Sequence, residues 1–272
     1  MRRFLFICLS LLAAVRGLAL AEARPALPEE VALFKDAMKG ATQDTEHWAY
    51  TETTTVRTNH EKDDPREETV VRFDPSKPYA EQFTPLKIGG QPPSARQLKQ
   101  YRKKGEERGK QLALKASREG EAGDKEPRII INDSKAKLDF EHPHVREVGV
   151  EGITFEIPLV AEGGGLPVDK FQIFAEVDRR TRQIKRARFH IREAFRMKLI
   201  AKIKSGDASL DFTEVNPEFP TVITKMTGEF GASFLLIPVK GTFTTTRTEW
   251  QRVKAFDEGF NVKLGPLQFP GF

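Results

Sequence analysis

The stretch FQIFAEVDRRTRQIKRARFHI, residues 171–191, decides the fold class, because it has the pattern of two strands joined by a turn. Phe171–Val177 and Ile184–Ile191 are each short and rich in aromatic and β-branched residues. The polar segment Asp178–Gln183 between them is typical of a hairpin turn. We therefore expect two adjacent antiparallel strands that form a hairpin.

Further strands are expected on both sides of this hairpin. Their ranges are Trp48–Val56, Thr69–Phe73, Gln82–Ile88, Ile153–Val160, Ala208–Val215, Val222–Pro238 (one strand or a pair) and Gly241–Phe256. Before Ala208, the residues Met197, Leu199, Ala201 and Ile203 alternate with polar ones, and Ser205-Gly206-Asp207 is expected to form a turn. About ten short strands with few helices predict a fold that is mainly β with α (α+β), a large antiparallel sheet curved into an unclosed β-barrel.

One or two helices are expected to cover this sheet. Leu27–Ala41 has Pro28 in its first turn and an apolar stripe, and Gly40 is a candidate end. Ser94 is expected to cap a second, highly charged helix from Ala95 to about Lys115. The stretch from 94 to 128 holds 11 Lys and Arg against 6 Asp and Glu. We predict a single domain over 22–272 that carries this stretch as a charged insertion.

The amino terminus has the features of an export signal. Arg2 and Arg3 precede the apolar run Phe4–Val15, and Ala19 and Ala21 supply the small residues that a signal peptidase recognises. An uncleaved anchor is the alternative. Cys8 is the single cysteine, so a disulfide framework is excluded. We expect cleavage after Ala21 and a periplasmic protein.

Charge and motifs exclude several function classes. The net charge of +5 falls to +2 without residues 1–21, because that segment holds three arginines and no acid. A nearly neutral chain gives no general reason to expect nucleic-acid binding. His142-Pro143-His144 is the best metal candidate, yet no further ligand pattern completes it. We predict no enzyme activity, no metal and no cofactor.

Aromatic composition is more informative. The chain has 20 Phe against 3 Tyr and 2 Trp, so most of its rings lack a polar group. Many of these rings fall on the apolar faces of expected strands. They either fill an ordinary core between sheet and helix, or line an apolar cavity for an acyl chain that a large sheet with few helices leaves unfilled.

The order of elements resembles the LolA-like superfamily. The resemblance rests on an exported chain with the helix at Leu27–Ala41, the strand start Trp48-Ala49-Tyr50-Thr51, the strand end Arg72-Phe73-Asp74-Pro75, a helical insertion and a run of antiparallel strands. It implies an unclosed antiparallel β-barrel capped by helices, with an apolar cavity that takes lipid acyl chains. It extends over roughly residues 27–256.

From these observations we predict a non-enzymatic, monomeric protein that holds a lipid or lipoprotein acyl chain. The cavity residues, chosen by strand parity, are Trp48, Tyr50, Val71, Phe73, Phe83, Phe155, Phe171, Ile173, Phe189, Leu199, Phe212, Phe230 and Phe243, with Val31, Leu33, Phe34 and Met38 as a lid. The alternative is an RseB-like envelope protein with a packed core that recruits a protein partner. The basic segment 96–128 could contact that partner or an anionic membrane surface.

Overall fold

The computed structural model describes residues 23–42, 45–58, 67–119, 128–131, 134–162, 167–197, 201–234 and 237–257. These residues form two compact units. The first unit holds the described parts of 1–43, 53–68 and 123–247, and the second those of 44–52, 69–122 and 248–272. Strands β2 (Trp48–Thr58), β3 (Glu67–Phe73) and β15 (Ile237–Arg252) contribute residues to both units.

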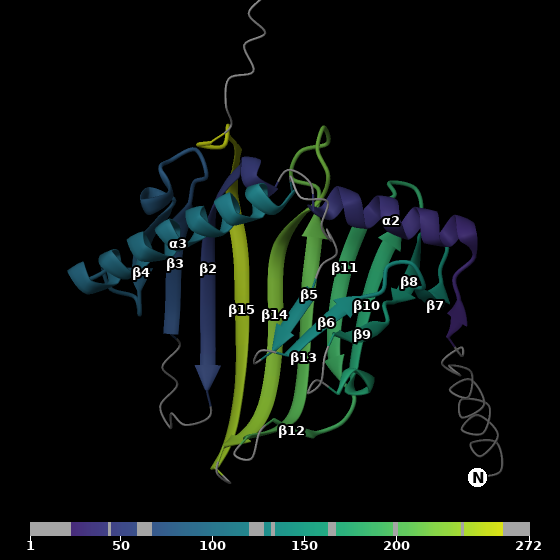
Figure 1. Cartoon of the computed structure of the whole chain (residues 1–272). Coiled ribbons are helices and arrows are strands. Elements are labelled where there is room, and N and C mark those ends of the chain that lie inside the picture. The colour runs from purple at the N-terminus through teal and green to yellow at the C-terminus, as the bar shows by residue number, and fades with distance from the viewer. Residues whose placement is uncertain are drawn as a thin grey trace, which may run out of the picture. The chain divides into compact units, whose positions relative to one another are not determined.

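Strands make up most of the described chain (Figure 1). The remaining strands are β1 Arg24–Pro25, β4 Phe83–Ile88, β5 Arg128–Ile131, β6 Ser134–Leu138, β7 His144–Val148, β8 Gly152–Glu156, β9 Leu159–Glu162, β10 Phe171–Asp178, β11 Ile184–Ile191, β12 Phe195–Met197, β13 Ala201–Thr213 and β14 Val222–Phe234. The helices of the described residues are α2 Pro28–Thr42 and α3 Ala95–Glu119, with short 3-10 helices η1 Thr45–His47, η2 Tyr79–Glu81 and η3 Val168–Lys170.

The main sheet of the first unit has the strand order β1-β7-β8-β10-β11-β13-β14-β15, with β12 paired to β13. The predicted hairpin is confirmed, since Phe171 pairs with Ile191 and Ala175 with Ala187 in an antiparallel register. In the second unit the order continues as β15-β2-β3-β4. Within the described residues neighbouring strands such as β10 and β11 pair in antiparallel fashion, and the order begins at β1 and ends at β4, so the sheet is antiparallel and unclosed, as expected.

Helix α2 buries its apolar stripe on one face of the first unit's sheet. Glu30 orders the first turn, because its carboxylate accepts the backbone N–H of Leu27 at 2.8 Å and an Arg24 guanidinium bond at 2.6 Å. Phe34 is fully buried with its ring centroid 5.1 Å from that of Phe155. Burial of a ring of this size stabilises a fold by about 2–3 kcal/mol. We call this side of the sheet, which carries Phe155 and Ala175, the apolar face, and the opposite side the polar face.

A second, three-stranded sheet was not expected. Its order is β5-β6-β9, and Ala136 of β6 packs with Phe171 and Phe195 of the main sheet. The prediction of one strand at Ile153–Val160 is wrong for this reason. Pro158 has no N–H to donate, so the ladder of β8 ends before it, and β9 then pairs with β6.

The predicted turn at Ser205-Gly206-Asp207 is also wrong, because β13 continues through these residues. The strand has an irregularity in its register between Ile203 and Ser205. Gly206 is needed inside the strand, since a Cβ there would lie only 2.7 Å from the Ile191 side chain. Glycine in a strand can mark such a close approach as well as a turn.

Helix α3 begins where the sequence predicts. Ser94 and Gln97 form a reciprocal cap, in which the Gln97 side chain accepts the Ser94 N–H at 2.8 Å. In the second unit the helix lies so close to η2 that Gly105 and Gly109 both face Tyr79. Within the described residues, neither helix has the length and apolar character needed to cross a membrane.

We predict that Gly105→Ala destabilises the protein although alanine favours helix. The new Cβ would collide with the backbone of Tyr79, and overpacking of this kind costs about 2 kcal/mol after the gain in helix propensity. The matched control is Gly40→Ala inside α2, where the nearest atom, in Pro220, is 3.9 Å from the Cβ position. Urea unfolding should show a lower free energy of unfolding for Gly105→Ala and an unchanged or higher one for Gly40→Ala. Equal effects at the two sites would contradict this packing.

Candidate functional site

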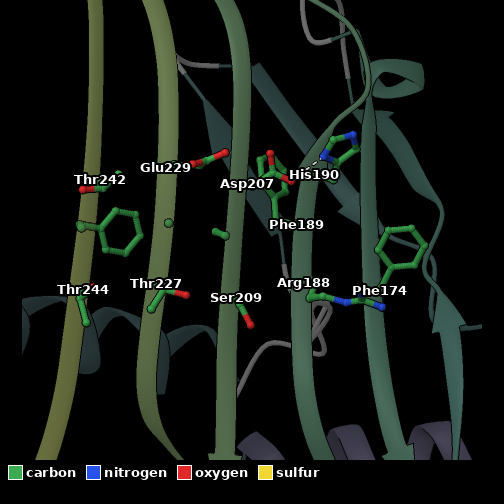
Figure 2. Close-up of a pocket in the computed structure, with 13 residues that line it drawn as sticks. Phe174, Arg188, Phe189, His190, Asp207, Ser209, Thr227, Glu229, Thr242 and Thr244 are labelled. Atoms are coloured by element: carbon green, nitrogen blue, oxygen red, sulfur yellow. Dashed lines mark hydrogen bonds and ion pairs between the residues drawn. The ribbon is translucent and has the colours of Figure 1, made fainter. Parts of the chain in front are cut away.

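An open hollow of about 540 Å³ lies against β10, β11, β13, β14 and β15 of the first unit, and Phe189, Ala208, Gly228 and Phe243 line it together with the polar-face residues of these strands. The register places Phe174, Arg188, Ser209, Thr227 and Thr244 in one row across five strands. A second row on the same face holds His190, Asp207, Glu229 and Thr242. Figure 2 shows these side chains spread along the strands rather than converging on one point.

Three charged groups of this hollow, His190, Asp207 and Arg188, have partners close to them. His190 Nδ1 lies 2.6 Å from an Asp207 carboxylate oxygen, and the Arg188 guanidinium lies 5.4 Å from the centre of the Phe174 ring. In the part of the chain that the structure describes, no three His, Cys, Asp or Glu side chains cluster as a metal site would require. The polar face has the properties of a solvated, hydroxyl-rich surface.

The apolar face has a different pattern on the same strands. One row holds Phe189, Ala208, Gly228 and Phe243, where each residue pairs with the next. In the neighbouring row Gly206 pairs with Phe230, which pairs with Gly241. Large and extremely small residues therefore meet across strands β11, β13, β14 and β15. The seven residues of these two rows form what we call the ring-on-glycine surface.

The glycines let the aromatic rings lie close to the sheet backbone. A Cβ at Gly241 would lie 2.6 Å from the Phe230 ring, and a Cβ at Gly228 would collide with the Phe243 ring. Both rings thus cover a glycine on the adjacent strand. The Phe230 side chain is 40% exposed, and Ile237 on β15 is 57% exposed. The result is an apolar surface close to the sheet backbone, which the described residues cover only in part.

The structure divides the predicted cavity residues between the two units. In the first unit Phe155 and Phe171 are buried, Ile173 and Phe212 pack at the edge of the core, and Phe189, Phe230 and Phe243 belong to the ring-on-glycine surface. Of the predicted lid, Leu33 and Phe34 are buried in the core, Met38 packs against it and Val31 is half-buried. Leu199, Ala19 and Ala21 lie outside the described residues.

The remaining predicted residues form an aromatic cluster in the second unit. Tyr50 lies 5.2 Å from Phe73, and Phe73 lies 5.0 Å from Phe83, between ring centroids. Trp48 and Val71 are buried beside them. Trp250, absent from the prediction, joins the cluster at 4.9 Å from Tyr50 and 6.0 Å from Trp48.

Helix α3 covers this cluster with two cations that sequence analysis missed. The Lys104 ammonium lies 4.4 Å from the centre of the Phe83 ring, and the Arg108 guanidinium lies 5.1 Å from that of Phe73. Arg108 also donates to Gln82 at 2.6 Å and pairs with Glu46. The spacing of four residues between Lys104 and Arg108 places both on one helix face, but a charged helix offers many such pairs.

A carboxylate network borders the polar face near Phe174. Glu156 is buried and accepts bonds from Arg192 at 2.6 Å and Gln172 at 3.3 Å, and it also pairs with Arg146. Burial raises the pKa of Glu156, but these hydrogen bonds and the charges of both arginines outweigh it, so the pKa lies below its ordinary value. The network therefore ties β7, β8, β10 and the end of β11 together.

The chain matches no protein-family model and no curated protein. Among solved structures it is similar to a LolA superfamily protein from Nitrosomonas europaea, with 6% sequence identity and a TM-score of 0.33. The alignment covers 82% of this chain and 92% of that one.

We predict that Glu156→Gln lowers the free energy of unfolding by about 3 kcal/mol at neutral pH, because two arginines would lose a buried anion. A carboxyl with a lowered pKa in the folded protein stabilises it above its unfolded pKa of about 4.3, and that contribution is lost as the pH falls further. The difference between the two proteins should therefore shrink in acid. Denaturant unfolding over a pH series measures it.

The matched control is Asp211→Asn, which removes a more exposed pair with Arg186. This substitution should lower the free energy of unfolding by less than about 1 kcal/mol. A Glu156→Gln effect that stays constant from neutral to acid pH would contradict the assignment.

Proposed function

We propose that this protein is a non-enzymatic binding protein that holds the acyl chain of a lipid or lipoprotein on the ring-on-glycine surface. The single observation that carries the proposal is the position of Phe230 and Phe243, whose rings cover Gly241 and Gly228 and leave apolar area exposed. Large exposed apolar patches on a soluble fold mark interaction sites. An apolar surface of this kind favours binding of a hydrocarbon chain.

The chemistry of the surface favours an acyl chain over a polar ligand. Phenylalanine rings, glycine and alanine offer no side-chain hydrogen bond, so affinity must come from apolar burial at about 25 cal/mol per Å². The backbone beneath the rings is already engaged in the strand ladder. A guest therefore needs only a flexible apolar body that follows the strands.

The core limits where the guest can lie. Phe171 is buried against Phe195 and Ala136, and Phe34 against Phe155, so this part of the apolar face is already filled. The half-exposed Phe230 and the exposed Ile237 lie on β14 and β15. We therefore place the acyl chain over β13, β14 and β15, and not beneath α2.

The second candidate function is an envelope protein that recruits a protein partner. The observation that favours it is the packing of α2, whose apolar residues Leu33, Phe34 and Ala37 are buried within the core. In that case the sheet would need no guest. Export to the periplasm, proposed from residues 1–21, suits either function.

We predict that Phe230→Asp together with Phe243→Asp abolishes binding of the acyl lipid, because two charges would lie on the hydrocarbon surface. The matched control is Thr242→Asp with Thr244→Asp, which adds the same charge to the opposite face of β15, the strand that carries Phe243. Native mass spectrometry and solvent extraction of protein purified from a periplasm measure the bound lipid. Phe230→Asp alone, at a 40% exposed position, tests the surface if the double variant fails to fold.

The wild-type protein and the control should carry the lipid, and the apolar-face variants should not. A wild-type protein free of lipid, or equal loss in both double variants, would overturn the proposal. A lipid-free wild-type protein that captures a defined envelope protein would support the second function.

A further inference from the structure

We propose that α3 docks the protein on an anionic phospholipid surface through its outward basic face. Residues 95–114 of the helix contain seven Lys and Arg against two Glu. A basic stretch of this density adjacent to a bilayer attracts phosphatidylglycerol-type head groups. The residues involved all belong to the second unit and lie outside the proposed acyl site.

The underside of α3 is fixed, which determines the face that remains outside. Gly105 and Gly109 are buried against Tyr79, and Arg108 is largely covered between Glu46 and Phe73. Lys104 leans over the Phe83 ring. These contacts hold the helix in one rotational setting about its own axis. They also occupy two of the seven cations, which are therefore not counted toward a partner.

The outward face carries four of the other five cations at helical spacing. Arg96, Lys99, Lys103 and Lys110 are separated by three, four and seven residues, so they lie along one side of the helix, and all are exposed. Lys103 has a distant pair with Glu107 at 3.7 Å. Leu114, one turn after Lys110, is 57% exposed on the same side. The basic row extends over about 20 Å.

This pattern fits a lipid surface better than a folded partner. Three of the four cations are lysines, whose charge on a flexible stem suits mobile phosphates more than fixed bidentate contacts. The centres of protein–protein interfaces are depleted of lysine. An exposed leucine beside the basic row can enter the boundary between head groups and acyl chains, as in helices that lie on membranes. We therefore assign an anionic bilayer as the partner.

The test is co-sedimentation of the full mature chain with vesicles. Phosphatidylcholine vesicles that contain phosphatidylglycerol should bind the protein at low salt, and added salt should weaken binding because it screens the charges. Phosphatidylcholine alone should bind it weakly. The variant Arg96→Gln, Lys99→Gln and Lys110→Gln should lower the partition coefficient on the order of 100-fold, at about fivefold per removed cation.

The matched control removes three exposed lysines of the first unit, Lys202→Gln, Lys204→Gln and Lys225→Gln, with the same change in net charge. It should keep wild-type binding. Glutamine has a helix propensity close to that of lysine, so circular dichroism should show unchanged folding in both variants. Co-purified acyl lipid should also remain in both, which separates this proposal from the acyl site.

Absence of binding to phosphatidylglycerol vesicles, equal binding to neutral vesicles, or equal loss in the control would overturn the proposal. Salt-sensitive binding that only the α3 variant loses would establish it.

Discussion

The pairing of rings with glycines across β13, β14 and β15 is the constraint on which the binding surface depends. Phe243 can lie over Gly228, and Phe230 over Gly241, only because neither glycine has a Cβ. Any larger residue at either glycine would push the ring away from the sheet, and the apolar surface would no longer lie close to the backbone. The same register sends Ser209, Thr227 and Thr244 to the opposite face, so one alternation produces both the apolar surface and the solvated one.

Small residues serve a second purpose in α3. Gly105 and Gly109 bring the helix against Tyr79, and the tyrosine hydroxyl in turn donates to Asp257 at 2.5 Å. Burial, and then this hydrogen bond, raise the pKa of Tyr79 to about 12, so the phenol keeps its proton at alkaline pH where an ordinary tyrosine ionises. The close approach places Lys104 and Arg108 over aromatic rings and directs the remaining cations outward. A helix that looks uniformly charged in sequence thus has one side that packs on the second unit and one side that is exposed.

Sequence periodicity predicted the class of the fold and most of its elements. The hairpin at residues 171–191, the helix before Trp48 and the cap at Ser94 all follow from local rules, which act within a few residues. The three-stranded sheet could not be predicted in this way, because the departure of β9 from the main sheet depends on a partner, β6, more than twenty residues earlier. Gly206 was misjudged for a related reason. A glycine in a turn and one beneath Ile191 look alike until the neighbouring strand is known.

For the candidate site, parity placed Phe189, Phe230 and Phe243 correctly on one face, but it could not say which apolar residues are already buried by others. Phe155 and Phe171 satisfy the same pattern, yet they pack against α2 and β6. The division of the aromatic residues between two units was equally invisible, since Trp48, Tyr50 and Phe73 lie on strands with the same alternation. The local sequence pattern predicts on which face of a strand a side chain lies, but it does not predict which other elements cover that side chain.

Photo-crosslinking with a diazirine-labelled fatty acid, followed by peptide mass spectrometry, tests the central claim most directly. Labelled residues should fall on β14 and β15 around Phe230 and Phe243. Label on Ser209, Thr227 and Thr244 of the polar face, or beneath α2 at Phe34 and Phe155, would contradict it.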